Sequence, residues 1–502
     1  GNSITSGGNY NVVVGDEAGT AISTADYTTA IGYAAGTAVT TGVRQTLIGG
    51  LAGDALTTGD NNTAVGYNSL SAMTVGDRNV AVGVGTLASA NVTSNADTYN
   101  TAVGFDAGND ITTGTKNTLI GGLAGDAITT GGANTAVGYS ALTTSTTGSN
   151  NTSIGRESLR VTTTGSNNVG VGSYAMYDNT TGGSNVAIGE SALSNNTTAS
   201  NNTAVGKSAL LANTTGAQNT AVGEGSLGAN TTASFNTALG ENALASNTTG
   251  TQNVAVGQAT LDTNTTGDNN TAVGRDALTA NTTASNNTAV GKAALSANTT
   301  GINNVAVGKD ALIASTTANN NTAVGYDCLQ ANTTGASNVA VGKSALESNT
   351  TAANNTAVGF GSLGANTTGA GNVAVGSVAL DSNTTGSNNV ALGADNLDTN
   401  TTGSDNTAVG KGALHFNTTA SNNTAVGRSA LLTNTTGAQN TSVGMNALYG
   451  NTTGTDNTGI GQGALQGNTT ASNNTAVGKA ALSVNTTGAS NTAVGKSALV
   501  AN

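Results

Sequence analysis

The chain of 502 residues contains no proline, no tryptophan, one cysteine and one histidine. The single cysteine, Cys328, excludes an intrachain disulfide framework. With His415 as the only histidine, we expect neither a Ser-His-Asp site nor a histidine-based metal site within one chain. Aromatic residues make up 3% and charged residues 8%, which is too few large apolar residues for a conventional core and too little charge for a solvated, disordered chain. A repetitive architecture of small residues is the remaining option.

The charge balance and the lack of long apolar runs exclude further classes. The net charge is −12 with 14 basic residues, so binding of nucleic acid through its phosphates is not expected. No apolar run reaches the length of a membrane span, and no signal-like segment opens the chain. Neither the calcium-binding nonapeptide nor a complete phosphate-binding loop is present, so no metal and no cofactor is predicted. We expect the chain to be a segment of a longer polypeptide.

A 17-residue repeat runs through the whole chain. A glycine that follows an aliphatic residue recurs at 15, 32, 49, 66 and 83, and then every 17 residues from 104 to 495, which makes 29 index glycines. One four-residue insertion, near residues 93–97, interrupts the frame. We describe each position by its offset from the index glycine, so that Val205 is at −1 and Lys207 at +1 of Gly206. A strict period of this kind is typical of a solenoid.

The positions within one repeat predict how a coil is built. Asn-Thr-Ala-Val-Gly at 202–206 fits a short strand whose Thr203 and Val205 share one face. The half that follows supplies Leu210, and we expect a second short strand there. We predict that Val205 and Leu210 point inward and that the alanine at −2 faces away from the core. Asn202 and Asn213 are expected to form amide ladders along the stack.

These features predict an all-β fold, a parallel β-solenoid or β-roll with 29 coils and one 17-residue coil per repeat. A strand-plus-helix repeat needs at least 20 residues, so 17 is too few. One coil cannot bury enough apolar surface by itself, and a single thin solenoid would also be marginal. We therefore predict a homotrimer, with the chains either intertwined or packed around one axis.

The segments NVAVG at 79–83 and NVAIG at 185–189 resemble the head repeats of trimeric autotransporter adhesins. The longer pattern NTAVGxxALxxNTTGxxN resembles repeats of tail-fibre proteins of phages and of some bacteria. The resemblance covers nearly the whole chain, although the 17-residue unit is longer than the usual adhesin-head unit. It implies a left-handed parallel β-roll with three chains per fibre.

Two regions of the same solenoid are distinguished by sequence. Residues 1–139 hold variant coils, the insertion and a block duplication, in which residues 27–67 recur as 99–139. Residues 140–502 hold regular coils. Single coils have been duplicated, and a block of several coils has been duplicated as well. Growth by duplication favours a segment that sets the length of the protein over a segment that holds an active site.

Position +1 is the most variable one, being basic in ten repeats, aromatic in six and acidic in four. Such variety indicates a position that faces water. It is either a solubilising stripe or a contact stripe for a host cell-surface glycan or receptor. The predicted contact residues are Tyr33, Tyr67, Phe105, Tyr139, Lys207, Tyr326 and Phe360.

The function predicted from the sequence is a non-enzymatic structural shaft of an extracellular attachment fibre, of the kind found in virion tail fibres. The alternative is the head or stalk of a trimeric adhesin or another filament on a bacterial cell surface. Ice binding is disfavoured, because the adjacent Thr-Thr pair of each repeat points to opposite faces. Cys328 occupies a position that is otherwise almost always alanine or serine, so we expect it to fill a tight interior slot.

Overall fold

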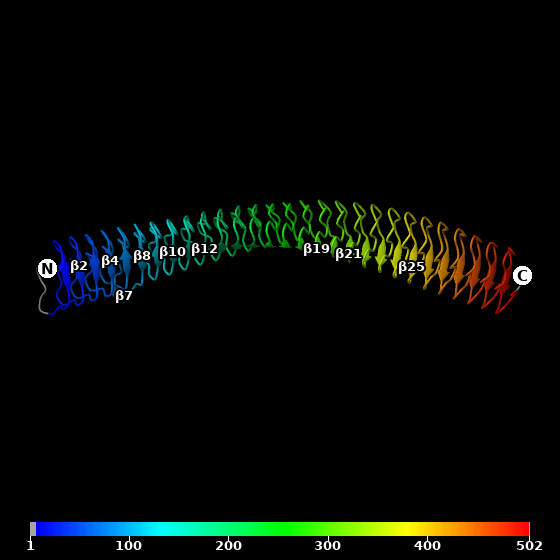
Figure 1. The fold of residues 1–502 in the computed structure, drawn as a ribbon, viewed down its shortest axis with the longest axis horizontal. Helices are drawn as coiled ribbons and strands as arrows, with labels where there is room; N and C mark the ends of the chain where they lie inside the picture. The colour runs from blue at the N-terminus through cyan, green and yellow to red at the C-terminus, as the bar shows by residue number, and fades with distance from the viewer. Residues whose placement is uncertain (1–6, 501–502) are drawn as a thin grey trace. The chain divides into compact units, whose positions relative to one another are not determined.

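A computed structural model describes residues 7–500, and within them the only regular elements are short strands and turns. The chain divides into two compact units, with the division between Gln252 and Asn253. Each unit is a parallel β-solenoid in which every repeat makes one coil, as Figure 1 shows by the succession of strands along each unit. A three-residue strand directly precedes each of the 29 index glycines. The predicted all-β solenoid with one coil per repeat is therefore confirmed.

The strands of the first unit's main sheet are β1 (Val12–Val14), β2 (Thr29–Ile31), β3 (Thr46–Ile48), β4 (Thr63–Val65), β6 (Val80–Val82), β8 (Thr101–Val103), β9 (Thr118–Ile120), β10 (Thr135–Val137), β11 (Thr152–Ile154), β12 (Val169–Val171), β13 (Val186–Ile188), β14 (Thr203–Val205), β15 (Thr220–Val222) and β16 (Thr237–Leu239). Two further strands of this unit, β5 (Gly76–Asp77) and β7 (Ala96–Asp97), pair with each other. The strands of the second unit are β17 (Val254–Val256), β18 (Thr271–Val273), β19 (Thr288–Val290), β20 (Val305–Val307), β21 (Thr322–Val324), β22 (Val339–Val341), β23 (Thr356–Val358), β24 (Val373–Val375), β25 (Val390–Leu392), β26 (Thr407–Val409), β27 (Thr424–Val426), β28 (Thr441–Val443), β29 (Thr458–Ile460), β30 (Thr475–Val477) and β31 (Thr492–Val494).

Equivalent residues of neighbouring coils lie side by side. In the pairing of β14 with β15, Thr203 faces Thr220 and Val205 faces Val222. The same register continues from β6 to β8, where Val82 faces Val103, so the insertion does not shift the frame. Its extra residues loop out instead, and part of them forms β7.

The predicted second strand of each coil is wrong. Ser208 and Leu210 have φ angles of 56° and 52°, and such left-handed residues interrupt an extended strand. The segment still bonds to the next coil, because the Leu210 N–H donates to the Ser226 carbonyl at 3.0 Å and the Thr214 N–H to the Thr231 carbonyl at 2.9 Å. The second half of each repeat is therefore a stack of turns that share parallel hydrogen bonds.

The predicted orientation of the strand is also wrong. Ala204 is fully buried, whereas Val205 is only half-buried and its counterparts Ile188 and Leu239 are 41% and 46% exposed. Leu210 is buried, as predicted.

The reason is the narrow interior opposite position −2. Gly170 occupies this position in its coil, and a methyl group there would lie 2.7 Å from Ser158 Oγ and 3.2 Å from Leu159 Cγ of the preceding coil. Where a leucine stands at +4, the interior therefore has room at −2 for a small residue, such as the buried Ala204, and not for valine. The larger aliphatic residue at −1 must point outward, because side chains alternate along a strand.

Two asparagine ladders run through the interior, as predicted. Asn202 Oδ1 accepts a hydrogen bond from the Asn219 N–H at 2.9 Å, and Asn202 Nδ2 donates to the Gly216 carbonyl at 2.9 Å. In the second ladder, Asn213 Nδ2 donates to Asn196 Oδ1 at 3.0 Å. Both side chains are buried, and these bonds satisfy polar groups that would be costly to bury unpaired. The ladders also keep successive coils in one register.

Candidate functional site

Position +1 forms an exposed stripe, and all seven predicted contact residues lie on it. The aromatic side chains are 44% to 58% exposed, and the Lys207 side chain is 60% exposed. Tyr33, Tyr67, Phe105, Tyr139 and Lys207 belong to the first unit, and Tyr326 and Phe360 to the second. The exposure of this stripe suits contact with a partner, and contact itself stays a prediction.

At residues 309–360 of the second unit, position +1 alternates lysines with aromatic rings. Lys309 Nζ lies 4.9 Å from the ring centroid of Tyr326, and Lys343 Nζ lies 5.8 Å from Tyr326 and 5.9 Å from Phe360. Cation–π contacts of this kind stabilise side chains along the stack, although each is weak at an exposed site.

In the first unit the rings lie over glycines. A methyl group at Gly50 would lie 3.4 Å from Tyr67 Cδ2, and one at Gly122 would lie 3.8 Å from Tyr139 Cδ2. The two pairs are equivalent positions of the duplicated block. Each tyrosine ring therefore lies beside the glycine of the preceding coil and stays more than half exposed, at 57% for both Tyr67 and Tyr139.

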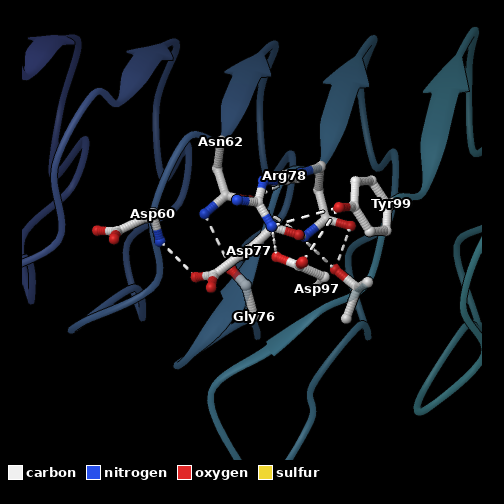
Figure 2. A network of polar contacts seen from close by, with 9 residues as sticks. Asp60, Asn62, Gly76, Asp77, Arg78, Asp97 and Tyr99 are labelled. Atoms are coloured by element: carbon white, nitrogen blue, oxygen red, sulfur yellow. Dashed lines mark hydrogen bonds and ion pairs between the residues drawn. The ribbon is translucent and has the colours of Figure 1, made fainter.

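The insertion is held to the solenoid by a polar network (Figure 2). Arg78 forms an ion pair with Asp97 of β7, and its guanidinium lies 5.5 Å from the ring centroid of Tyr99. The Tyr99 hydroxyl donates to Asp97 Oδ2 at 3.0 Å, and the Asp60 N–H donates to Asp77 Oδ1 at 2.6 Å. These carboxylates are occupied by protein donors, so the network is a structural clamp.

The one cysteine of the chain lies in the interior and is poorly placed to react. Cys328 is buried, and its Sγ donates to the Ala340 carbonyl at 3.2 Å. Burial raises the pKa of this thiol to about 12, so the nucleophilic thiolate is scarce at neutral pH. Cys328 thus fills the small interior slot that the sequence predicted. Among residues 7–500, no group of three or more histidine, cysteine or acidic side chains could hold a metal ion.

Sequence reasoning missed a hollow at residues 395–432. Its volume is about 510 Å³, and Asp395, Lys411, Gly412, His415, Arg428, Ser429 and Leu432 line it. Gly412 stands at position +2, where the neighbouring coils carry Asp395 and Ser429. That missing side chain is the signal by which the hollow could have been found. A smaller hollow of about 390 Å³ lies beside Gly361, which is also a +2 glycine.

Comparison with known proteins places the chain in no family. No protein-family model matches it, and a search of curated proteins found no match. In the described part of the chain, no helix is long and apolar enough to cross a membrane. The functional argument therefore rests on the geometry of the coils.

Proposed function

We propose that this chain is a non-enzymatic structural shaft of an extracellular attachment fibre, most simply a phage tail fibre, which acts as a rigid spacer. The observation that supports it best is the uniform stacking of coils within each unit. Each strand pairs in the same register with the next, and buried asparagine ladders and index glycines recur coil after coil. In such a stack the number of repeats sets the length, since each coil adds one inter-strand spacing. The head or stalk of a bacterial surface adhesin is the alternative role for the same stack.

The proposed shaft is a homotrimer, and the outward face of the strands is its proposed contact surface. This face carries Thr or Val at −3 and Val, Ile or Leu at −1 of every coil. Thirteen residues at −1 are at least 36% exposed, Ile188 and Leu239 among them. Contiguous exposed apolar residues are typical of a surface that contacts a partner. Because identical rows recur on every copy, a further copy of the chain is the partner that fits.

The length-setting role can be tested by removing whole coils. Deleting residues 152–202 removes three repeats of the first unit and leaves the frame intact. We expect a folded chain whose fibre is shorter by about 14 Å in electron micrographs, from the ~4.8 Å strand spacing. An unfolded product, or an unchanged length, would count against a spacer. Antibodies that label virion tails would support the phage assignment, whereas label confined to bacterial surfaces would support the adhesin.

Ice binding is a second candidate, favoured by one feature of the outward face. Thr at −3 recurs in 20 of the 29 repeats, and these threonines lie in rows at the strand spacing beside the aliphatic rows. The rows are broken by nine valines, and of the adjacent Thr214 and Thr215 the first is half-buried and the second exposed. Measurement of thermal hysteresis with the purified chain tests ice binding. A measurable difference between the melting and freezing temperatures would favour it, and no difference would exclude it.

A further inference from the structure

We propose that the hollow over Gly412 binds an acidic sugar unit and that Lys411 and Arg428 hold its carboxylate. The binding proposal extends the proposed function of an attachment fibre. It depends on that function in one respect, which is that the acidic sugar would belong to a cell-surface glycan. The binding chemistry belongs to residues of the second unit and can be tested with a free monosaccharide.

The hollow exists because one side chain is missing from a regular row. A methyl group built at Gly412 would have Leu432 Cδ1 at 3.5 Å and Ser429 Oγ at 3.9 Å as its nearest neighbours, which are ordinary contact distances. The glycine therefore leaves room that a larger residue could fill. Its volume of about 510 Å³ lies in the range of small-molecule sites, roughly 300–1,000 Å³.

The neighbouring coils are also loosened at this point. Asn396 stands at +3, where most coils have alanine or serine, and its side chain is buried. Asn396 Nδ2 donates to the Leu392 carbonyl at 2.8 Å, and its Oδ1 accepts from the Ala413 N–H at 3.1 Å. A methyl group built at Gly206 would lie 2.6 Å from the backbone of the next coil. One built at Gly393 would lie 3.1 Å from the backbone of the next coil, so the two coils are farther apart there.

Two cations flank the hollow without carboxylate partners. Lys411 and Arg428 occupy +1 of successive coils, are exposed, and make no ion pair with any residue of the described chain. Lys207, Arg275 and Lys309, at the same position, are each paired with a carboxylate, whereas Lys292 and Lys479, like Lys411 and Arg428, make no ion pair within residues 7–500. Lys411 and Arg428 differ from these in lining a hollow together. A guanidinium binds a carboxylate through two parallel N–H donors, and an ammonium adds a third. The free pair is therefore suited to an anionic group.

The other lining residues suit the remainder of a sugar. The ring of His415 packs edge-on against Phe416 at 4.4 Å between centroids, and its Nδ1 lies 2.9 Å from the Asp395 carbonyl oxygen. Because that oxygen can only accept, Nδ1 carries the proton and Nε2 is left for a ligand. Asp395 and Ser429 can bond hydroxyl groups, and Leu432 offers an apolar surface to a ring face. The single carboxylate of Asp395 is outweighed by the two cations Lys411 and Arg428, so the lining keeps a positive charge.

The second hollow shows that charge, and not shape alone, should decide the ligand. The space beside Gly361 is lined by Phe360, Glu347 and Asp381, with no lysine or arginine. Because acidic side chains and no cation line this hollow, an added anion would be repelled there. We expect no acidic sugar to bind there.

Titration of the intact chain with glucuronate, glucose, acetate and inorganic phosphate tests the proposal. Protein-observed NMR shifts report the affinity and the place of binding. We expect glucuronate to shift signals around Gly412 and to bind at least fivefold more tightly than glucose or acetate. Equal binding of glucose would overturn the role of the cations. Phosphate or acetate binding as tightly as glucuronate would overturn the role of the sugar ring.

Three variants sharpen the test. Arg428→Gln and Lys411→Gln should each weaken glucuronate binding about tenfold, the usual size of one lost charge-assisted contact. Gly412→Asn should abolish it by filling the space, and asparagine already occupies +2 with a similar φ at Asn242 and Asn446. Lys292→Gln, on the same stripe but outside the hollow, is the control and should change nothing. Unchanged affinity in Gly412→Asn would refute the site, while a failure of the fibre proposal would appear only in mass and length measurements.

Discussion

The side chain of Leu119 fills the space that a leucine at Gly125 would need. A methyl group built at Gly125 would lie 2.8 Å from Leu119 Cδ2 and 2.8 Å from Ile128 Cδ1, and one at Gly108, in the preceding coil, 2.7 Å from Leu119 Cδ1. Most coils have another arrangement, with alanine at −2 and leucine at +4, as at Ala204 and Leu210. In the coil of Gly121 the large buried side chains are instead Leu119 at −2 and Ile128 at +7.

This exchange predicts strong coupling between Leu119 and Gly125. Leu119→Ala should cost about 2–5 kcal/mol, because it leaves a cavity. Gly125→Leu should also destabilise, by overpacking. The double variant should be less destabilised than the two effects added together, by at least ~1 kcal/mol in urea unfolding followed by circular dichroism. Additive effects would show that the two sites do not share one space.

Replacement of an index glycine should be among the most damaging single changes. Gly206 has a φ of 133°, and a methyl group there would lie 2.6 Å from the Gly223 backbone. Gly206→Ala is therefore expected to lower the free energy of unfolding by about 2–4 kcal/mol, from strain and clash together. The neighbouring exposed Lys207→Ala should stay within ~0.5 kcal/mol of the parent. Similar losses in both variants would contradict the argument.

Asp126 makes stability depend on pH. The pKa of its carboxyl is raised to about 6, mainly by burial and to a smaller extent by the nearby charges of Asp110 and Asp106. The backbone hydrogen bond from Ala127 lowers this pKa, but by less than burial raises it. The folded state thus holds the proton more tightly than the unfolded state, so stability falls as pH rises from about 4 to about 6 and stays lower above that.

Asp126→Asn should remove this loss. We expect it to be more stable than the parent at pH 7 by on the order of 1 kcal/mol, since partial exposure screens the charge. Below pH 4 the two proteins should unfold at similar urea concentrations. Glu224→Gln changes an exposed carboxylate and serves as the control, with no expected shift. A parent whose stability does not fall between pH 4 and pH 6 would refute the prediction.

The outward strand face can be tested through the proposed trimer. Ile188 is 41% exposed and lies between Val171 and Val205 on that face. Ile188→Lys, repeated at two neighbouring coils, should reduce the native mass from three chains toward one, because lysines buried in an interface lose hydration. Lys207→Ala should leave the mass unchanged. A monomeric parent would refute the trimer at once.

Cys328 should be unreactive in the folded chain. Its burial and raised pKa predict no labelling by a maleimide at pH 8 within hours, and complete labelling after denaturation. Mass spectrometry distinguishes the two states. Rapid labelling of the folded protein would show that its coil opens.

Much of the fold could be read from the repeat itself. The period established one coil per repeat, the leucine of each coil was recognised as interior, and both asparagine columns were recognised as ladders. The variability of position +1 correctly indicated exposure. These predictions follow from the residue type at each position of the repeat. Stacking places equivalent side chains above one another, so the residue at a given position meets the same environment in every coil.

The direction in which the strand faces was decided only by the tertiary structure. Alternation in Thr203-Ala204-Val205 separates two faces but does not say which is inside. The answer depends on the distance across the coil, which the left-handed residues Ser208 and Leu210 make too short for valine opposite leucine. The hollow at Gly412 needed the structure for another reason: the glycine is visible in the sequence, but only the stacked coils show that Asp395, Lys411 and Arg428 line one space beside it.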